Sequence, residues 1–199
     1  MFIEDLSPCR YLGSPYDPEG KQLKAVGWLA TEHPYTRRLS PFPETRFYQL
    51  LRLLQDPWEP CHFMGDHECP FCFSNPPPFS LEKNKEPVER TVSRRVLAGG
   101  ECIEFQGPES EDYDRRHRME RDDLVIYFGA ANLFIPGEGF IYVAPSMIAH
   151  YVAAHHYEPP VEFWDAVMNC PEMRSDAYMQ ALLANGPSNE KWARDVRLG

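Results

Sequence analysis

Two separated groups of cysteine and histidine residues constrain this chain more than any other feature. The first group lies in His67-Glu-Cys-Pro-Phe-Cys72, and the second is His150-Tyr-Val-Ala-Ala-His155, much later in the chain. Cys-x-x-Cys is the spacing of a tight turn that directs both sulfurs to one point, and His-x4-His is found in zinc fingers. We therefore predict that Cys69, Cys72, His150 and His155 bind one tetrahedral zinc ion, around which the chain folds.

This donor set can be buried, because two thiolates and two neutral imidazoles balance the two positive charges of a zinc ion. An ideal helix would place His150 and His155 about 140° apart around its axis, so we expect the helix to loosen near His155. The fourth ligand position has alternatives. Other residues able to bind a metal lie near the two groups, with His156 and His67 as the main rivals and Cys61 and His62 as weaker ones.

The composition is that of a folded, acidic domain. Of the 199 residues, 43% are hydrophobic and 13% aromatic, which is typical of globular proteins, and the length suits a single domain over residues 1–199. Twenty basic and thirty acidic residues give a net charge of −10. Binding to nucleic acid or to anionic membranes is disfavoured, because a basic face supplies most of the affinity for them. The charge instead suits another protein, a basic one, as the partner.

The first residues of the chain do not predict export. The segment Met1-Phe-Ile-Glu-Asp5 is acidic and lacks the charged start and apolar centre of a signal peptide. No apolar run has the length of a membrane span. We therefore expect a cytoplasmic protein whose six cysteines are reduced, either as metal ligands or as packed side chains.

Hydrophobic periodicity predicts both helices and strands. Phe47, Leu50, Leu51 and Leu54 share one face of a helix over residues 43–56. Strands are expected at 25–29, 124–128, 132–135 and 140–143, with a further hairpin inside 92–106. Helices are expected from residue 145 to the second histidine, from 160 to 170, over 176–184, and around Trp192 with Ser188 as N-cap.

These elements predict an α+β fold: a small zinc-stabilised domain with a treble-clef or finger-like knuckle, β-hairpins and then helices. We place its zinc-centred core at about 61–170, with charged loop insertions at about 74–95 and 107–123. The helix that starts near residue 160 is expected to bury one stripe of side chains, namely Val161, Trp164 and Met168, flanked by Phe163 and Val167.

Three segments of the chain resemble a group of small uncharacterised bacterial proteins. In that group a His-x-Cys-x-x-Cys block precedes a strand-turn-strand and a His-Tyr-Val-x-x-His-x-Tyr-x-Pro-Pro helix. The resemblance covers roughly residues 25–170, implies a zinc-type site and implies no particular activity. The matching segments are Gly27-Trp-Leu29 with His33-Pro-Tyr35, the block at 67–72, and the stretch from Tyr142 to Phe163.

Three functional hypotheses follow. The first is a non-enzymatic, zinc-stabilised protein-binding module, for example an immunity protein or another inhibitor of a basic toxin, because opposite charges speed association. The second is a zinc-dependent hydrolase, in which Cys69, Cys72 and His150 plus a water complete the site and Glu158 or Glu68 acts as base. The third, a nucleic-acid-binding finger, is disfavoured because residues 145–156 contain neither lysine nor arginine.

The motifs of known zinc enzymes do not fit. His67-Glu68 lacks the second histidine of His-Glu-x-x-His, and zinc deaminases need a His-x-Glu upstream of Pro-Cys-x-x-Cys. Four protein ligands also leave no position for a catalytic water. The sequence therefore favours a structural zinc ion over a catalytic one.

Overall fold

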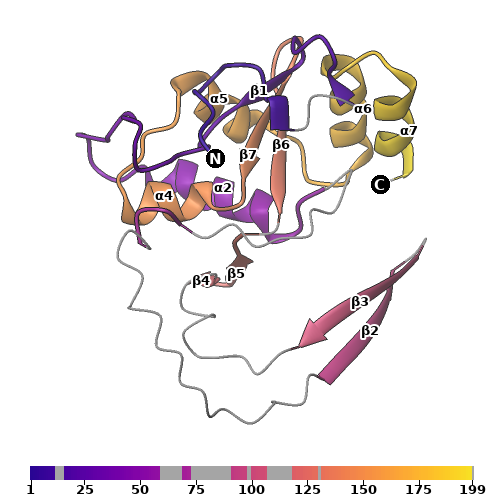
Figure 1. Ribbon diagram of the computed structural model, residues 1–199, viewed down its shortest axis with the longest axis horizontal. Helices are drawn as coiled ribbons and strands as arrows, with labels where there is room; N and C mark the ends of the chain where they lie inside the picture. Colours follow the sequence, from indigo (N-terminus) through magenta and orange to yellow (C-terminus); the bar gives the residue numbers. More distant parts are fainter. Residues whose placement is uncertain are drawn as a thin grey trace.

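The computed structural model describes residues 1–11, 16–58, 69–72, 91–97, 100–106, 118–129 and 131–198, with 91–97 and 100–106 as backbone only. The fold is mixed α+β, as predicted (Figure 1). The helices described are α2 (Glu44–Gln55), α4 (Ile148–Ala154), α5 (Val161–Asn169), α6 (Asp176–Asn185) and α7 (Glu190–Leu198). The strands described are β1 (Leu23–Ala25), β2 (Thr91–Leu97), β3 (Gly100–Gln106), β4 (Arg118–Arg121), β5 (Leu124–Tyr127), β6 (Asn132–Pro136) and β7 (Ile141–Pro145).

A three-stranded sheet in the order β1-β7-β6 lies at the centre of the molecule. β6 and β7 form an antiparallel hairpin in which Phe134 faces Val143, and β1 pairs with β7 in parallel. The predicted strand at 25–29 is therefore displaced, because the paired residues begin at Leu23. Successive side chains of a strand point to opposite faces, so the sheet contributes to two separate hydrophobic cores.

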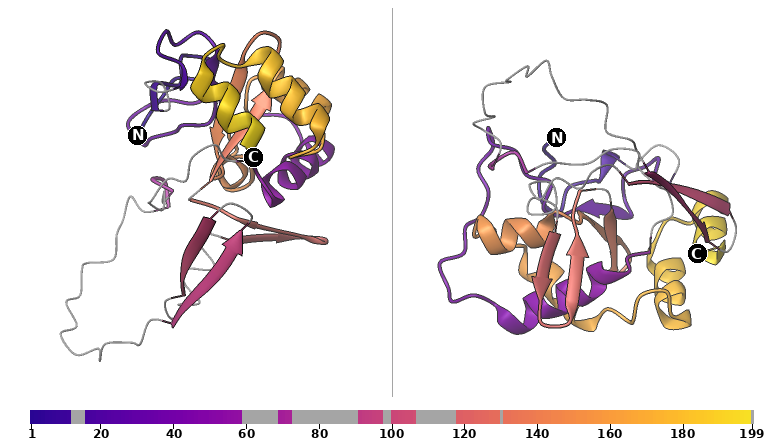
Figure 2. Two further views of the ribbon diagram at one scale, coloured as in Figure 1. Left: turned by 90° about the vertical axis from the view of Figure 1, so that its right-hand side faces the viewer. Right: turned by 90° about the horizontal axis from the view of Figure 1, so that it is seen from below.

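The two cores lie on opposite faces of the sheet, as the strand residues in each show. The first, which we call the α4-side core, is built from α2, α4, α5, β5 and one face of the sheet, and includes Phe47, Leu50, Leu51, Ile126, Leu133, Ile135, Ala144, Ile148, Tyr151, Val152, Phe163 and Trp164. The second, the α7-side core, contains Tyr16, Leu23, Ala25, Trp58, Phe134, Ile141, Val143, Tyr178, Leu182, Trp192 and Val196. Figures 1 and 2 show α4 at one end of the molecule and α6 with α7 at the other.

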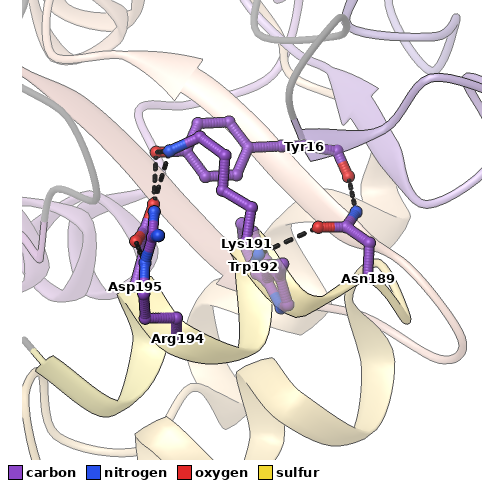
Figure 3. Close-up of polar contacts among 6 residues, drawn as sticks. All are labelled: Tyr16, Asn189, Lys191, Trp192, Arg194 and Asp195. Carbon is purple, nitrogen blue, oxygen red and sulfur yellow. Dashed lines mark hydrogen bonds and ion pairs between the residues drawn. The ribbon is translucent and has the colours of Figure 1, made fainter.

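Helix α7 is attached to the N-terminal part of the chain by polar contacts (Figure 3). The Tyr16 hydroxyl donates to the Asp195 carboxylate at 2.9 Å, and the Lys191 ammonium group lies 2.8 Å from the same oxygen and 3.1 Å from the Tyr16 hydroxyl. The Asn189 amide donates to the Tyr16 carbonyl, and its oxygen accepts from the Trp192 backbone N–H at 2.9 Å. Asn189, rather than the predicted Ser188, therefore caps α7.

The structure confirms the apolar stripe of α2, whose Phe47, Leu50, Leu51 and Leu54 are all buried, and adds Leu53 to it. Pro43 precedes the first helical residue, where its fixed φ is compatible with the start of a helix. The helix thus begins and ends within one residue of the prediction.

The predicted buried stripe of α5 is wrong at both ends. Phe163, Trp164 and Val167 are buried, but Val161 is 60% exposed and Met168 is 42% exposed. Both sets of residues have helical spacing, so periodicity alone does not choose between them. Packing selects the stripe with two aromatic rings, because it removes more apolar surface from water.

Parts of the two predicted insertions form strands. Residues 91–95 belong to β2, which pairs antiparallel with β3 as the predicted hairpin, and residues 118–121 are β4, paired with β5. The charged sequence of β4 still places Met119 against the α4-side core, because every second side chain of a strand faces the same way. Residues 74–90 and 107–117 lie outside the described part of the chain. Among the described residues, we find no helix with both the length and the apolar character that crossing a bilayer requires.

Candidate metal centre

The first half of the site is the short turn Cys69-Pro-Phe-Cys72. Cys69 is buried, whereas Cys72 is exposed. Burial raises the pKa of Cys69 to about 12, although the backbone N–H groups of Cys72 and Phe71 donate hydrogen bonds to its sulfur and act in the opposite direction. A thiol in this place stays protonated at neutral pH unless a cation lies against it.

The second half of the site lies at the end of α4. His150 belongs to the helix, and His155 is its C-cap residue with φ −110° and ψ 6°. The His155 backbone N–H still bonds the Tyr151 carbonyl at 3.1 Å, but its torsion angles have left the helical region. This is the loosening that the five-residue separation required, and it brings both imidazoles to the same side.

The four side chains meet at one point. The Nε2 atoms of His150 and His155 lie 3.1 Å apart, and His155 Nε2 lies 3.1 Å from Cys69 Sγ and 3.4 Å from Cys72 Sγ. Cys72 Sγ lies 3.4 Å from His150 Nε2. All four donor atoms fall within 4.8 Å of one another, so the group could hold a metal ion.

These separations can be compared with an ideal zinc site. Zinc–sulfur bonds of about 2.3 Å and zinc–nitrogen bonds of about 2.0–2.1 Å give a tetrahedron with edges of about 3.3 Å between nitrogens and about 3.6 Å between sulfur and nitrogen. Four of the six separations between donor atoms, at 3.1–3.4 Å, are slightly shorter than these edges, and none of the six exceeds 4.8 Å. A small rearrangement of the side chains would therefore admit the ion.

Aromatic rings cover the protein side of the group. The Phe71 ring lies 5.0 Å from the His155 ring and 5.3 Å from the Tyr35 ring, centroid to centroid. The Phe128 ring lies 6.3 Å from the His150 ring. Phe71, which lies between the two cysteines, is thus joined by rings from two other parts of the chain. The four donor atoms therefore have aromatic rings on their protein side, while solvent reaches the exposed Cys72 on the other side.

Two further contacts hold the end of α4. The Tyr35 hydroxyl donates to the His155 carbonyl at 3.1 Å, and the Arg38 guanidinium donates to the Val152 carbonyl at 3.3 Å. Burial lowers the pKa of His155, and the nearby positive charge of Arg37 adds to this effect. The imidazole is therefore held in the neutral form that binds metals. No sequence spacing indicates these residues, because they are distant in the chain.

The alternatives for the fourth ligand can be compared with these positions. His156 has a positive φ of 56°, is exposed, and has its Nδ1 atom 3.3 Å from the Arg38 guanidinium. It is not part of the group of four donors, which contains His155 instead. His67, Cys61, His62 and Glu68 lie outside the described residues.

The fold and the site define a class: a small α+β domain with a Cys2His2 group able to hold a metal ion. Within that class the chain belongs to the family described as the domain of unknown function DUF7919, which matches residues 1–168. The matched residues contain all four donors, whereas α6 and α7 lie beyond them. No curated protein and no solved structure matches the chain.

Proposed function

We propose that this chain is a non-enzymatic, zinc-stabilised domain that acts by binding another protein. The observation that carries the metal part of the proposal is the mutual approach of four donor atoms of two kinds, two sulfurs and two imidazole nitrogens, within 4.8 Å. Thiolate and imidazole in a tetrahedral arrangement are preferred by zinc, while magnesium and calcium prefer oxygen ligands.

The arrangement supports a structural ion more than a catalytic one. Four protein donors fill the tetrahedron, and among the described residues no carboxylate belongs to the group. Glu158, one candidate for a general base, accepts a hydrogen bond from the Trp164 indole N–H at 3.0 Å. A hydrolase would need His155 to leave the group so that water could take its place.

The ion would connect two parts of the fold that are distant in sequence. Cys69 and His155 are separated by 86 positions, and their side chains close a long loop of the chain. Zinc binding in finger peptides contributes about 10–16 kcal/mol in apparent free energy, which is comparable with the whole stability of a domain, about 5–15 kcal/mol. Even a fraction of that value would make the α4 side of the fold dependent on metal.

Cobalt substitution tests the coordination. Cobalt(II) bound by two thiolates and two imidazoles has intense visible bands and a sulfur-to-metal charge-transfer band, and both differ when water replaces a protein ligand. We expect a four-coordinate spectrum and one zinc per purified chain. Cys72→Ser should lower the metal content below one, whereas Cys170→Ser, a matched change outside the group, should not. A five-coordinate or water-containing spectrum would instead favour the hydrolase.

The net charge of −10 supports a basic protein partner, and an immunity protein that neutralises a basic toxin is the most concrete form of this proposal. Complementary charges speed association and make it dependent on salt. The test is binding to purified basic proteins encoded beside the gene, measured at low and high salt, with and without zinc. Tight binding that weakens with salt would support the proposal, and binding to DNA at physiological salt would contradict it.

A further inference from the structure

The two sulfurs of the candidate metal centre differ in how far solvent can reach them. Cys72 is exposed, whereas Cys69 is buried. A dissolved oxidant attacks a thiolate that it can reach, and cysteines that sense oxidants are accessible and lie next to a second cysteine. The turn at 69–72 has this arrangement, because Cys72 meets the solvent and Cys69 lies behind it. Cys170, which is half-buried, does not belong to the group of four donors.

The two sulfurs are also close enough to react with each other. Their Sγ atoms lie within 4.8 Å, and both are near His155, whose Nε2 atom is 3.1 Å from Cys69 Sγ and 3.4 Å from Cys72 Sγ. A disulfide bond has a sulfur–sulfur length of about 2.05 Å, so the sulfurs would have to approach by about 3 Å or less. Cys-x-x-Cys is a spacing at which disulfides form in redox proteins. The same turn can therefore hold a metal ion or close a disulfide, but not both.

Oxidation by a peroxide would convert the first state into the second in two balanced steps. The Cys72 thiolate attacks an oxygen of hydrogen peroxide, the oxygen–oxygen bond breaks, and the hydroxide that leaves takes up a proton, which gives a sulfenic acid on Cys72 and one water. The Cys69 thiolate then attacks the Cys72 sulfur, the sulfur–oxygen bond breaks, and the leaving hydroxide is protonated to a second water. The two sulfurs lose two electrons in total, and the peroxide gains them.

The disulfide cannot replace the two thiolates as a metal ligand. Metal binding needs deprotonated thiolates, and the disulfide carries neither of their negative charges. His150 and His155 then remain as the described donors of the group, and two neutral imidazoles supply only half of a tetrahedral site. Formation of the disulfide therefore releases the ion, and with it the connection between the turn at 69–72 and the end of α4.

We propose that Cys69 and Cys72 form a redox switch, in which a peroxide oxidises them to a disulfide and expels the metal ion. This inference rests on the proposed zinc site and adds its regulation. The exposed Cys72 is the sulfur that is attacked first, and the buried Cys69 is the one that closes the disulfide. A dithiol reductant reverses the change by thiol–disulfide exchange, and the reduced turn binds the ion again.

The first test uses the full chain loaded with zinc and treated with hydrogen peroxide. Released zinc is measured with a coloured chelator, and disulfides are located by mass spectrometry. We expect release of all the bound zinc together with a disulfide between Cys69 and Cys72, and recovery of the zinc-bound state after dithiothreitol and added zinc. Cys170→Ser is the control and should behave like wild type. Zinc that is retained through the peroxide treatment, or released without this disulfide, would overturn the inference.

A second test measures the order in which the two sulfurs react, and it needs no variant. N-ethylmaleimide is added to the zinc-loaded wild-type chain in less than stoichiometric amount, and the labelled cysteines are identified by mass spectrometry. We expect Cys72 to be labelled several-fold faster than Cys69, because Cys72 is the exposed member of the pair. Equal labelling, or faster labelling of Cys69, would overturn the assignment of Cys72 as the first sulfur to react. A purified chain that neither contains nor takes up zinc would contradict the proposed function instead.

Discussion

Each of the two cores on opposite faces of the central sheet contains segments that are distant in the chain, but the polar side chains that join these segments differ between the two cores. On the α4 side, Cys69 and Cys72 meet His150 and His155, and two imidazole nitrogens face each other at 3.1 Å. On the α7 side, hydrogen bonds and an ion pair join the parts directly, as in the Asp195 contacts. The Asp195 contacts pair protein groups directly with one another, whereas the four donors of the α4 side converge on a point that a cation would fill.

The family match adds to this comparison. It includes every donor of the metal group and ends within α5, so the α4-side core lies inside the matched residues. The α7-side core combines matched residues such as Tyr16 and Phe134 with Tyr178 and Trp192, which lie beyond the match. The metal group therefore lies within the residues that the family match covers, and we expect the two faces to respond independently to changes.

The largest effect should come from disrupting the metal site. Cys72→Ser, or removal of the proposed zinc ion by a chelator, should lower the free energy of unfolding by about 5 kcal/mol or more, because metal binding to sites of this kind is coupled to folding. Chemical unfolding with and without chelator measures the difference. Cys170→Ser is the control. Identical unfolding curves with and without chelator would show that the α4 side does not depend on metal.

A large loss of stability in the α7-side core should leave the metal content of the protein unchanged. Trp192 is fully buried and its indole N–H bonds the Leu182 carbonyl at 3.1 Å. Trp192→Ala should cost about 3–5 kcal/mol through loss of packing while retaining full metal content. Metal analysis and unfolding at saturating zinc measure both quantities. Loss of zinc in this variant would mean that the two faces are coupled through the sheet.

The stability that the polar contacts of α7 contribute should depend on pH. Burial raises the pKa of Asp195, but the hydrogen bonds from Lys191, Tyr16 and Arg194 outweigh this effect and lower it below the ordinary 3.8. The stability that this carboxylate contributes is therefore fully present above pH 3.8, and it is lost as the pH falls through the lowered pKa of Asp195. Asp195→Asn should cost about 1 kcal/mol at neutral pH. Urea titrations should show that cost shrinking below pH 3.8, and a cost independent of pH would contradict the argument.

A carboxylate on the α4 side should show the opposite dependence. Asp5 accepts from the Gly27 backbone N–H at 2.9 Å and from the Tyr157 hydroxyl at 2.8 Å, but burial, the largest influence, raises its pKa above 3.8. Its stabilising contribution is therefore present below 3.8 and lost as the pH rises through the raised pKa.

Asp5→Asn removes the pH dependence of stability that comes from the Asp5 carboxyl group. We expect the variant to gain stability relative to wild type, by less than about 1 kcal/mol, as the pH is raised from 3 to 7. The same urea titrations measure it, and the changes in Asp5→Asn and Asp195→Asn should have opposite signs. Parallel changes in the two variants would show that the pH dependence comes from elsewhere.

Local features of the fold could be predicted from the sequence alone, because they depend on neighbours along the chain. The α2 stripe follows from helical periodicity, and the break of α4 at His155 follows from the five-residue spacing of the two histidines. The four donors could also be proposed in advance, since their residue types and spacings are specific to a metal with sulfur and nitrogen ligands.

Choices that depend on contacts between distant segments were decided only by the tertiary structure. Periodicity allowed two buried stripes on α5, and packing chose the one with Phe163 and Trp164. Histidine spacing left His155 and His156 open, and the folded chain places His155 in the group of donors and leaves His156 exposed.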